Sequence, residues 1–335
     1  MKAAIFKKSL YELEITDIAK PDLINNGAII KIHGCGLCSS DIIKIKKHLI
    51  SDNTVLGHEV IGKITEINFK NIENKNFKVG DKVAIGHHVP CYQCVYCKNQ
   101  SYSMCKNFKE SNIVPGGFSE YIYVSEAHLK NTVFKIPDNL SDMEASFVEP
   151  SACCLRAVKR ANVKPGDKVL VIGLGSIGQI IGQIAKYYGA ETNGYDLITE
   201  RLELAKELGF DNVYKVNKDA SKYNDIGADK VFLASGSPSS LELALASVRD
   251  GGMIIVFASL SSDNGAFLNN DIYYRELTVM GSYSPSPPDL CEALNLIKNS
   301  KIKVNRFAKE YSLENINKAI KDTLENKIIK AYIKL

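Results

Sequence analysis

The stretch Lys168–Gly178, KVLVIGLGSIG, joins an apolar run of strand length to a glycine-rich turn. In the next stretch, Ile177–Tyr188, apolar residues recur at the spacing of one helix face. A buried strand, a Gly-x-Gly-x-x-Gly turn and a helix, in this order, predict the first βα unit of a parallel sheet that binds a dinucleotide.

The same alternation of strands and helices extends from about residue 150 to residue 288. The expected strands are Lys168–Ile172, Glu191–Tyr195, Val213–Val216, Lys230–Ala234, Met253–Phe257 and Leu277–Gly281. The expected helices between them are Ile177–Tyr188, Thr199–Leu208 and Ser239–Val248. Strands that alternate with helices indicate βαβ units and a doubly wound parallel sheet, so this region is predicted to be an α/β domain.

Each glycine of the turn has a physical task. Gly173 permits the tight turn, Gly175 lets the backbone approach a pyrophosphate, and Gly178 lets the helix pack closely on the sheet. The helix begins at Ser176 and Ile177, where free N–H groups and the helix dipole favour an anion. These five residues are the predicted cofactor-binding residues of the turn; the alternative is a glycine-rich turn without a ligand.

An acidic residue stands at the distance that a dinucleotide site needs. Asp196 follows the next strand, 23 residues after Gly173. A carboxylate there accepts hydrogen bonds from both ribose hydroxyls and repels a 2′-phosphate, which favours NAD over NADP. Arg201, five residues further on, could moderate this preference.

The flanking regions have a different texture. Before residue 149 the expected strands are short and separated by Gly, Asn and Pro: Ala28–His33, Val60–Ile67, Lys82–Ile85 and Phe118–Val124. They indicate an irregular β domain. After residue 288 come two amphipathic helices and a last strand, Pro288–Lys298, Leu313–Leu324 and Lys327–Lys334.

The last strand needs a sheet to join. We expect it to return to the first domain, which makes that domain discontinuous (1–149 and 289–335) around a dinucleotide-binding domain (150–288). The length of 335 residues agrees with about two domains.

Composition excludes several classes of protein. The net charge of +4 is too small to argue for a nucleic-acid or membrane partner. The first residues, MKAAIF, lack the apolar run of a signal peptide, so we expect a cytoplasmic enzyme.

Four of the nine cysteines stand within fifteen residues: Cys91, Cys94, Cys97 and Cys105. Two successive Cys-x-x-Cys steps and a fourth thiol match a closed structural Zn²⁺ site with no open position for catalysis. The alternatives are chance clustering of buried thiols and a redox Cys-x-x-Cys motif.

Three other segments carry chemical groups. Cys38 precedes Ser40, His58 and Glu59 are adjacent, and Glu149 stands before Pro150. Taken one at a time, the first is typical of a core thiol, the second of a polar core residue and the third of an acid in the first turn of a helix.

Taken together and in this order, these segments resemble the zinc-dependent medium-chain dehydrogenases, the family of alcohol and polyol dehydrogenases. The resemblance covers the whole chain and includes the segment Gly116–Tyr121, GGFSEY. Within the family the chain is similar to the sorbitol and threonine dehydrogenase branch, because Glu149 and Pro150 stand where other alcohol dehydrogenases carry a third zinc cysteine. The resemblance implies a GroES-like β domain followed by a Rossmann domain.

The resemblance also implies the residues of a catalytic site. Cys38 and His58 would be zinc ligands, and Glu149 would be the third, directly or through water. Glu59 would be a nearby carboxylate that binds the metal when water leaves, and Ser40 the hydroxyl that takes the substrate proton. With the four-cysteine site, two zinc ions per chain are expected.

Some positions depart from the family. A histidine that often continues the proton relay is replaced by Ile43, and the reach of the nearby His48 is open. Tyr92 and Asn99 stand where relatives often carry glycine. Cys153, one helical turn after Glu149, is an alternative third zinc ligand; Glu149 is preferred because cysteine is commonly a buried helix residue.

The expected activity is hydride transfer between a secondary alcohol, a polyol or sugar alcohol, and NAD. The chain would act on small molecules as a homodimer or homotetramer, and the edge strand Leu277–Gly281 could pair with its copy in another subunit. The alternatives are a threonine-type or aminocyclitol dehydrogenase and a non-catalytic scaffold that binds zinc and NAD. The retained ligands argue against a zinc-free quinone reductase.

Overall fold

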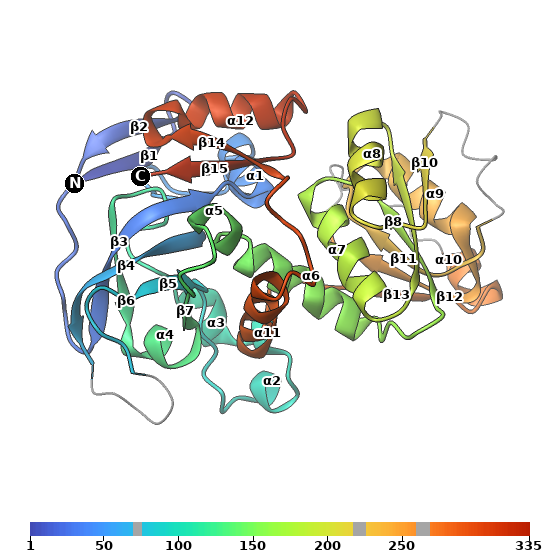
Figure 1. The fold of residues 1–335 in the computed structure, drawn as a ribbon, viewed down its shortest axis with the longest axis horizontal. Coiled ribbons are helices and arrows are strands. Elements are labelled where there is room, and N and C mark those ends of the chain that lie inside the picture. The colour runs from blue at the N-terminus through green and yellow to red at the C-terminus, as the bar shows by residue number, and fades with distance from the viewer. Residues whose placement is uncertain (70–75, 217–225, 259–268) are drawn as a thin grey trace. The chain divides into compact units, whose positions relative to one another are not determined.

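The computed structural model describes residues 1–69, 76–216, 226–258 and 269–335 (Figure 1). The chain forms two compact units. Unit 1 comprises Met1–Pro150, Ser286–Lys298 and Val304–Leu335, and unit 2 comprises Ser151–Pro285 and Asn299–Lys303.

One short segment differs from the expected division. Asn299–Lys303 belongs to unit 2, whereas the sequence analysis placed it in the first domain. The cause is the buried amide of Gln183, which donates a hydrogen bond to the Lys303 carbonyl at 3.1 Å and accepts one from its N–H at 2.7 Å.

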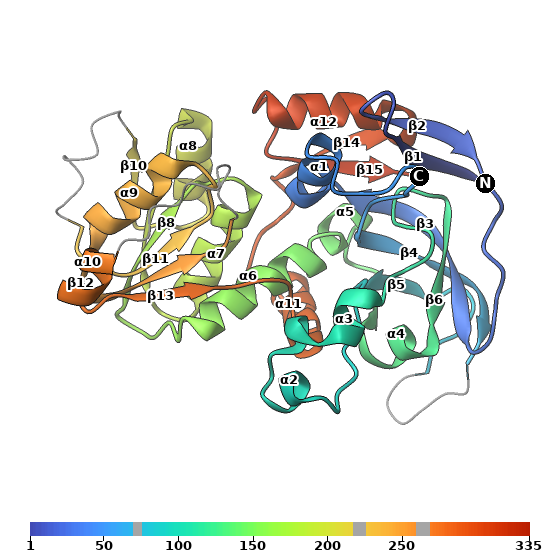
Figure 2. The same cartoon turned by 180° about the vertical axis from the view of Figure 1, so that it is seen from behind.

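Unit 2 is a parallel sheet with helices on both faces. Its strands are β8 (Lys168–Ile172), β9 (Glu191–Asp196), β10 (Asn212–Lys215), β11 (Ala228–Leu233), β12 (Val248–Val256) and β13 (Thr278–Gly281). Its helices are α7 (Ser176–Tyr187), α8 (Thr199–Glu207), α9 (Pro238–Ser247) and α10 (Asn269–Tyr274). Helices α7 and α8 cover the face seen in Figure 1, and α9 and α10 the face seen in Figure 2.

The strand order is β10-β9-β8-β11-β12-β13, and every pairing is parallel. Strand β8 lies at the centre, and its residues Val169, Leu170 and Val171 are fully buried because helices cover both faces. Strands β9 and β10 follow β8 on one side of it, and β11 lies on its other side, so the strand order reverses direction at β8. Ligands of such sheets bind at this reversal, beside the carboxyl end of β8.

Unit 1 is built on a sheet that is mostly antiparallel. Its strands are β1 (Lys2–Lys7), β2 (Glu12–Asp17), β3 (Gly27–Gly36), β4 (Glu59–Asn68), β5 (Lys82–Ile85), β6 (Tyr121–Ser125), β7 (Val133–Lys135), β14 (Ala308–Ser312) and β15 (Lys330–Lys334). Its helices are α1 (Ser39–Lys46), α2 (Val95–Lys98), α3 (Lys106–Glu110), α4 (Glu126–Asn131), α5 (Asp142–Ala145), α11 (Pro287–Lys298) and α12 (Ile316–Leu324), with 3₁₀ turns at Tyr102–Met104 and Leu313–Asn315. Helix α6 (Val148–Arg160) contains the unit boundary at Pro150.

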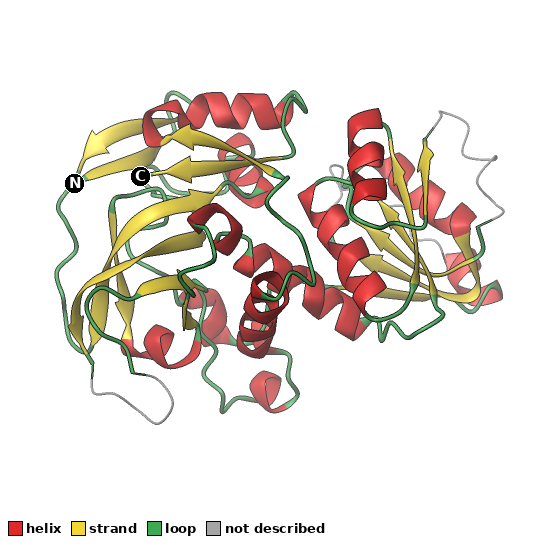
Figure 3. Ribbon diagram, viewed as in Figure 1, coloured by secondary structure: helices red, strands yellow, loops and turns green. Residues whose placement is uncertain are grey.

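The main sheet of unit 1 has the order β14-β15-β3-β4-β5-β7, and β6 pairs with β3 (Figure 3). Strand β15 pairs antiparallel with β3, so the last strand returns to the first unit as expected. Its parallel neighbour β14 was not predicted. Strands β1 and β2 form a separate antiparallel pair.

The strand expected from Met253 begins at Val248. Two other predicted strand boundaries are wrong because hydrogen bonds place these residues outside the strands. The strand expected at Phe118 begins at Tyr121, because the N–H of Phe118 donates to Leu56 and its carbonyl accepts from Ala4. The strand expected at Lys327 begins at Lys330, because the N–H of Lys327 donates to the carbonyl of Asp322 and closes the end of α12.

In the described part of the chain, no helix has both the length and the apolar character needed to cross a membrane.

Candidate functional site

The glycine-rich turn follows β8 with the expected geometry. Gly173 has φ +93°, which an L side chain rarely adopts, and a Cβ on Gly178 would lie 1.9 Å from the Gly173 carbonyl oxygen. Among the described residues, no atom lies within 4 Å of a Cβ built on Gly175, so the turn is open at this position. Gly175 caps α7, whose first residues are Ser176 and Ile177.

Asp196 ends β9, and the backbone fixes its carboxylate. Oδ2 accepts from the Leu174 N–H at 2.6 Å, and Oδ1 accepts from the Ile198 N–H at 2.9 Å. A guanidinium nitrogen of Arg201 lies 3.8 Å from Oδ2. The structure therefore places Asp196 and Arg201 next to the glycine-rich turn, as a ribose-binding acid requires.

The four clustered cysteines converge within one short loop. Their sulfur atoms all lie within 4.8 Å of one another. The sulfur of Cys97 is 4.0 Å from that of Cys91 and 3.6 Å from that of Cys94. A tetrahedral zinc ion with Zn–S bonds of about 2.3 Å needs S···S separations of about 3.8 Å, whereas a disulfide needs about 2.05 Å. The arrangement fits a closed zinc site.

Backbone N–H groups favour the thiolate form of Cys105, one of the four clustered cysteines. Burial opposes ionisation of Cys105, but the N–H groups of Cys91 and Phe108 point at its sulfur and lower its pKa to about 6. Zinc binds the thiolate form. Tyr92 stands where relatives often carry glycine, and it adopts the left-handed backbone conformation of a glycine, with φ +60°. The turn after Cys91 therefore forms without a glycine.

A second cluster of possible metal ligands brings together residues from two separate segments of the sequence. Cys38 caps the N-terminus of α1, and His58 and Glu59 stand at the start of β4. Their sulfur, imidazole and carboxylate atoms lie within 4.8 Å of one another. Gly57 makes this approach possible: its φ is +93°, and a Cβ there would lie 2.9 Å from the Phe118 nitrogen. We call Cys38, His58 and Glu59 the mixed-ligand group.

Asp41, which the sequence analysis did not single out, orients His58. One of its carboxylate oxygens lies 3.3 Å from His58 Nδ1, and its side chain is fully buried. Burial alone would lower the pKa of His58, but the charges of Asp41 and Cys38 raise it well above the usual value. A carboxylate behind a metal-binding imidazole fixes its tautomer and orientation.

Lys330 of β15 is a second residue that the sequence analysis missed. Its ammonium lies 2.7 Å from one carboxylate oxygen of Glu59 and 2.6 Å from the other, and both side chains are buried. Burial alone would lower the pKa of Lys330, but the charge of Glu59 outweighs it and raises the pKa. The charges of Cys38 and Glu149 act in the same direction.

Glu149 is near the mixed-ligand group but is not part of it. The carboxylate is buried in the first turn of α6, and its charge is felt by Lys330. It does not belong to the set of ligand atoms within 4.8 Å of one another. Cys153 is half-buried on the same helix. The choice between them as third ligand stays a prediction.

The position at which many relatives carry a relay histidine is occupied by Ile43 in this chain. Ser40 is half-buried in the first turn of α1, two residues after Cys38. Ile43 is 39% exposed. The ring of His48 packs against Tyr11 at a centroid distance of 4.3 Å, so this histidine has a local packing partner.

Four aromatic rings connect the two groups. The ring of His87 lies 4.8 Å from that of His58 and 3.9 Å from that of His88, which in turn lies 4.9 Å from Phe108. Phe108 packs with Cys97 and Cys105. Burial lowers the pKa of His87 well below its usual value and that of His88 to about 4, so both rings are neutral near pH 7.

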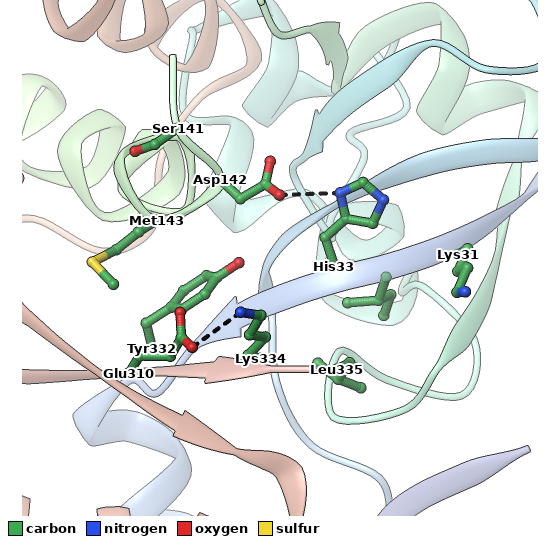
Figure 4. Close-up of a pocket in the computed structure, with 10 residues that line it drawn as sticks. Lys31, His33, Ser141, Asp142, Met143, Glu310, Tyr332, Lys334 and Leu335 are labelled. Atoms are coloured by element: carbon green, nitrogen blue, oxygen red, sulfur yellow. Dashed lines mark hydrogen bonds and ion pairs between the residues drawn. The ribbon is translucent and has the colours of Figure 1, made fainter.

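Unit 1 also contains a cavity of about 520 Å³ at the edge of its sheet (Figure 4). Two pairs of its lining side chains interact: His33 with Asp142 at 3.1 Å, and Lys334 with Glu310 at 3.2 Å. A hydrogen bond from His33, assisted by Lys82, lowers the pKa of Asp142 to about 2. None of the predicted site residues is among the ten that line this cavity.

The donor atoms of the mixed-ligand group fit zinc. A thiol, an imidazole and a carboxylate are its usual protein ligands. Oδ2 of Asp41 is buried and accepts no hydrogen bond within the described residues, so the carboxylate is held behind His58 by its approach to Nδ1 alone.

The comparisons with known proteins agree with this geometry. Residues 25–138 match the family described as the alcohol dehydrogenase GroES-like domain, and residues 176–299 match the zinc-binding dehydrogenase family. A sorbitol dehydrogenase of Bacillus subtilis (strain 168) is 33% identical over 80% of this chain and 78% of its own length. A D-arabitol-phosphate dehydrogenase of Enterococcus avium is 30% identical over 96% of this chain and 94% of its own.

A solved structure supports the same assignment. Acetophenone reductase from Geotrichum candidum in complex with NAD superposes with a TM-score of 0.87 at 26% identity, covering 100% of this chain and 97% of that one. This agreement extends over both units, and the GroES-like and Rossmann folds expected from the sequence are confirmed. The chain belongs to the zinc-dependent alcohol and polyol dehydrogenases of the medium-chain family.

Proposed function

We propose that the protein is an NAD-dependent dehydrogenase that oxidises a secondary alcohol, a polyol or sugar alcohol, to the ketone. The observation that carries the proposal is the convergence of Cys38, His58 and Glu59 within 4.8 Å, with the buried carboxylate of Asp41 3.3 Å from the His58 imidazole. The similarity to a sorbitol dehydrogenase supports the substrate class.

Two zinc ions per chain are part of the proposal. Cys38 and His58 would hold the catalytic ion, with Glu149 as third ligand, and Cys91, Cys94, Cys97 and Cys105 would hold the structural ion. A catalytic zinc ion polarises the alcohol oxygen and lowers its pKa by several units.

The residues of the chain position and deprotonate the alcohol. Asp41 keeps His58 in one orientation, and Lys330 holds the carboxylate of Glu59 beside it. The Ser40 hydroxyl accepts the proton of the alcohol oxygen and passes it outward. Bound NAD would accept the hydride from the carbon that bears this oxygen.

NAD is proposed rather than NADP because the carboxylate of Asp196 is fixed by two backbone N–H groups. It accepts hydrogen bonds from the ribose hydroxyls and repels a 2′-phosphate. The pyrophosphate binds at Ser176 and Ile177, at the N-terminus of α7.

A homodimer or homotetramer is proposed from the edge strand β13. It pairs only with β12 among the described strands, and its residue Val279 is 46% exposed. An exposed edge strand can pair with its copy across a two-fold axis.

The test is a substrate panel with the zinc-loaded enzyme, in which formation of NADH is followed by absorbance. We expect turnover with a polyol and NAD, and less with NADP. A chelator should abolish turnover while calorimetry still detects NAD binding. Turnover that survives complete removal of zinc would reject the mechanism, and a preference for an amino alcohol or aminocyclitol would replace the substrate class.

A further inference from the structure

The cavity shown in Figure 4 belongs to neither of the two candidate metal sites nor to the glycine-rich turn. Its volume of about 520 Å³ lies within the range of small-molecule binding sites. Its lining comes from strands β3, β14 and β15, from the start of α5 and from the last residue of the chain, so it lies entirely within unit 1.

Two features of the backbone form this cavity. Strand β15 pairs antiparallel with β3, and Lys334 lies opposite Gly34. Tyr332, two residues earlier on β15, faces the same side of the sheet, and a Cβ on Gly34 would lie 2.1 Å from its hydroxyl oxygen. The pairing of β3 with β4 shifts register between Ile32 and Gly34, so His33 is the extra residue of a β-bulge. A bulge redirects its side chain, and His33 lines the cavity.

The hydroxyl of Tyr332 is available to a ligand. The side chain is 97% buried, since only 3% of the residue is exposed. Among the residues that the structure describes, its hydroxyl makes no hydrogen bond. In Figure 4 the hydroxyl points toward the side chains of Asp142 and His33. Buried hydroxyl groups are usually paired, so one that is left unpaired at a cavity is a candidate contact for a bound molecule.

The acidic side chains of the cavity already have cationic partners. One carboxylate oxygen of Asp142 lies 3.1 Å from Nδ1 of His33, and the other lies 2.7 Å from the ammonium of Lys82. Glu310 accepts a hydrogen bond from Lys334 at 3.2 Å. The cavity therefore offers few unused acceptors to a ligand.

Donors, in contrast, remain unused. The ammonium of Lys31 makes no ion pair or hydrogen bond with any described residue. Burial, assisted by the charge of Asp142, raises the pKa of Tyr332, so its hydroxyl keeps the proton that it can donate. Apolar groups of Ile32 and Met143 complete the lining. Unused donors, an unpaired positive charge and apolar groups match a ligand with an anionic head and an apolar body.

We propose that this cavity is a binding site for a small organic carboxylate. The Tyr332 hydroxyl donates a hydrogen bond to the carboxylate, and the ammonium of Lys31 balances its charge. Ile32 and Met143 contact the apolar body of the ligand. The site uses no residue assigned to zinc or to NAD, so the inference does not rest on the proposed function.

The experiment is calorimetry on the zinc-loaded full chain with three probes: benzoate, benzamide and inorganic phosphate. Benzoate and benzamide have the same shape and differ in charge, whereas phosphate carries charge without an apolar body. We expect saturable binding of benzoate, about tenfold or more tighter than that of either other probe, because a hydrogen bond to a charged group and the apolar contacts are both needed.

Three variants locate the bound benzoate. Tyr332→Phe keeps the ring and should weaken benzoate binding by about tenfold or more, because it removes a hydrogen bond to a charged group. Lys31→Met should weaken it by about two- to fivefold, because this ammonium is exposed. The control is Lys63→Met: Lys63 is an exposed lysine opposite Lys31 on β4, outside the cavity lining, and its loss should leave the affinity unchanged. Tyr332→Phe should keep the wild-type Tm, since the hydroxyl has no partner among the described residues.

The other outcomes would overturn the proposal. Equal affinity of the wild type and Tyr332→Phe for benzoate would show that benzoate binds elsewhere, such as at a zinc ion. No saturable binding by the wild type would show that the cavity has no affinity for a carboxylate. Benzamide or phosphate that bound as tightly as benzoate would reject the organic carboxylate as the ligand class.

Discussion

The two candidate metal sites are built in opposite ways. The four-cysteine cluster takes all its ligands from residues 91–105, and the loop between them supplies its own backbone hydrogen bonds. The mixed-ligand group takes one ligand from the start of α1 and two from the start of β4, and its supporting residue Lys330 comes from the last strand.

The two sites therefore depend on different parts of the structure. The cysteine cluster needs only a short loop that closes on an ion. The mixed-ligand group needs the sheet order β15-β3-β4, because β3 leads into α1 and β15 delivers Lys330. It also needs buried charges to balance, since a removed partner leaves an uncompensated charge in the interior. Four substitutions test this difference between the two sites.

The largest effect is expected in the cysteine cluster. Cys105→Ser should remove one zinc ion per chain and lower Tm by about 10 °C or more, because zinc binding contributes on the order of 10 kcal/mol to such loops. Metal analysis and thermal unfolding would measure both. Cys291→Ser, an exposed cysteine outside the cluster, is the control. A variant that kept both ions would show that Cys105 is not a ligand.

The next effect separates catalysis from stability. Cys38→Ala should lower kcat by about 10³-fold or more, because the polarisation of the alcohol oxygen contributes several kcal/mol. Tm should change far less than in Cys105→Ser. Steady-state kinetics and thermal unfolding are measured on the same sample. Full activity of Cys38→Ala would show that Cys38 is not a ligand of a catalytic metal ion.

The charge balance can be tested on β15. Lys330→Met should reduce the free energy of unfolding by about 3–5 kcal/mol, because it leaves the buried carboxylate of Glu59 unpaired. Lys334→Met on the same strand removes an exposed pair with Glu310 and should cost at most about 1 kcal/mol. Urea unfolding of the zinc-loaded proteins measures the difference. Equal losses would contradict the structural role of the Lys330 pair.

The smallest effect is expected from the residue that orients His58. Asp41→Asn should lower zinc affinity or kcat/KM by about 10- to 100-fold, the usual effect of a lost hydrogen-bonding partner of a metal ligand. Competition with a chelator gives the affinity. Asp52→Asn, at an exposed acid outside the group, should leave it unchanged. If both variants bound zinc like the wild type, Asp41 would not position His58.

Sequence alone determined the features that depend on neighbours along the chain. The strand Lys168–Ile172 is found within its predicted bounds, and the glycine-rich turn and α7 follow it, because hydrophobic periodicity and glycine conformation act locally. The spacing of the four cysteines is also a local property, which is why it predicted the cluster that the structure assembles.

Contacts between residues that are far apart in the sequence follow from the tertiary structure. Asp41 and Lys330 look like ordinary surface charges in the sequence, and no periodicity or spacing connects Lys330 with Glu59, 271 residues away. Their burial follows from strand pairing, which the sequence does not display. The strand β14 and the attachment of Asn299–Lys303 to unit 2 were missed for the same reason, since a neighbouring strand and the amide of Gln183 supply their hydrogen bonds.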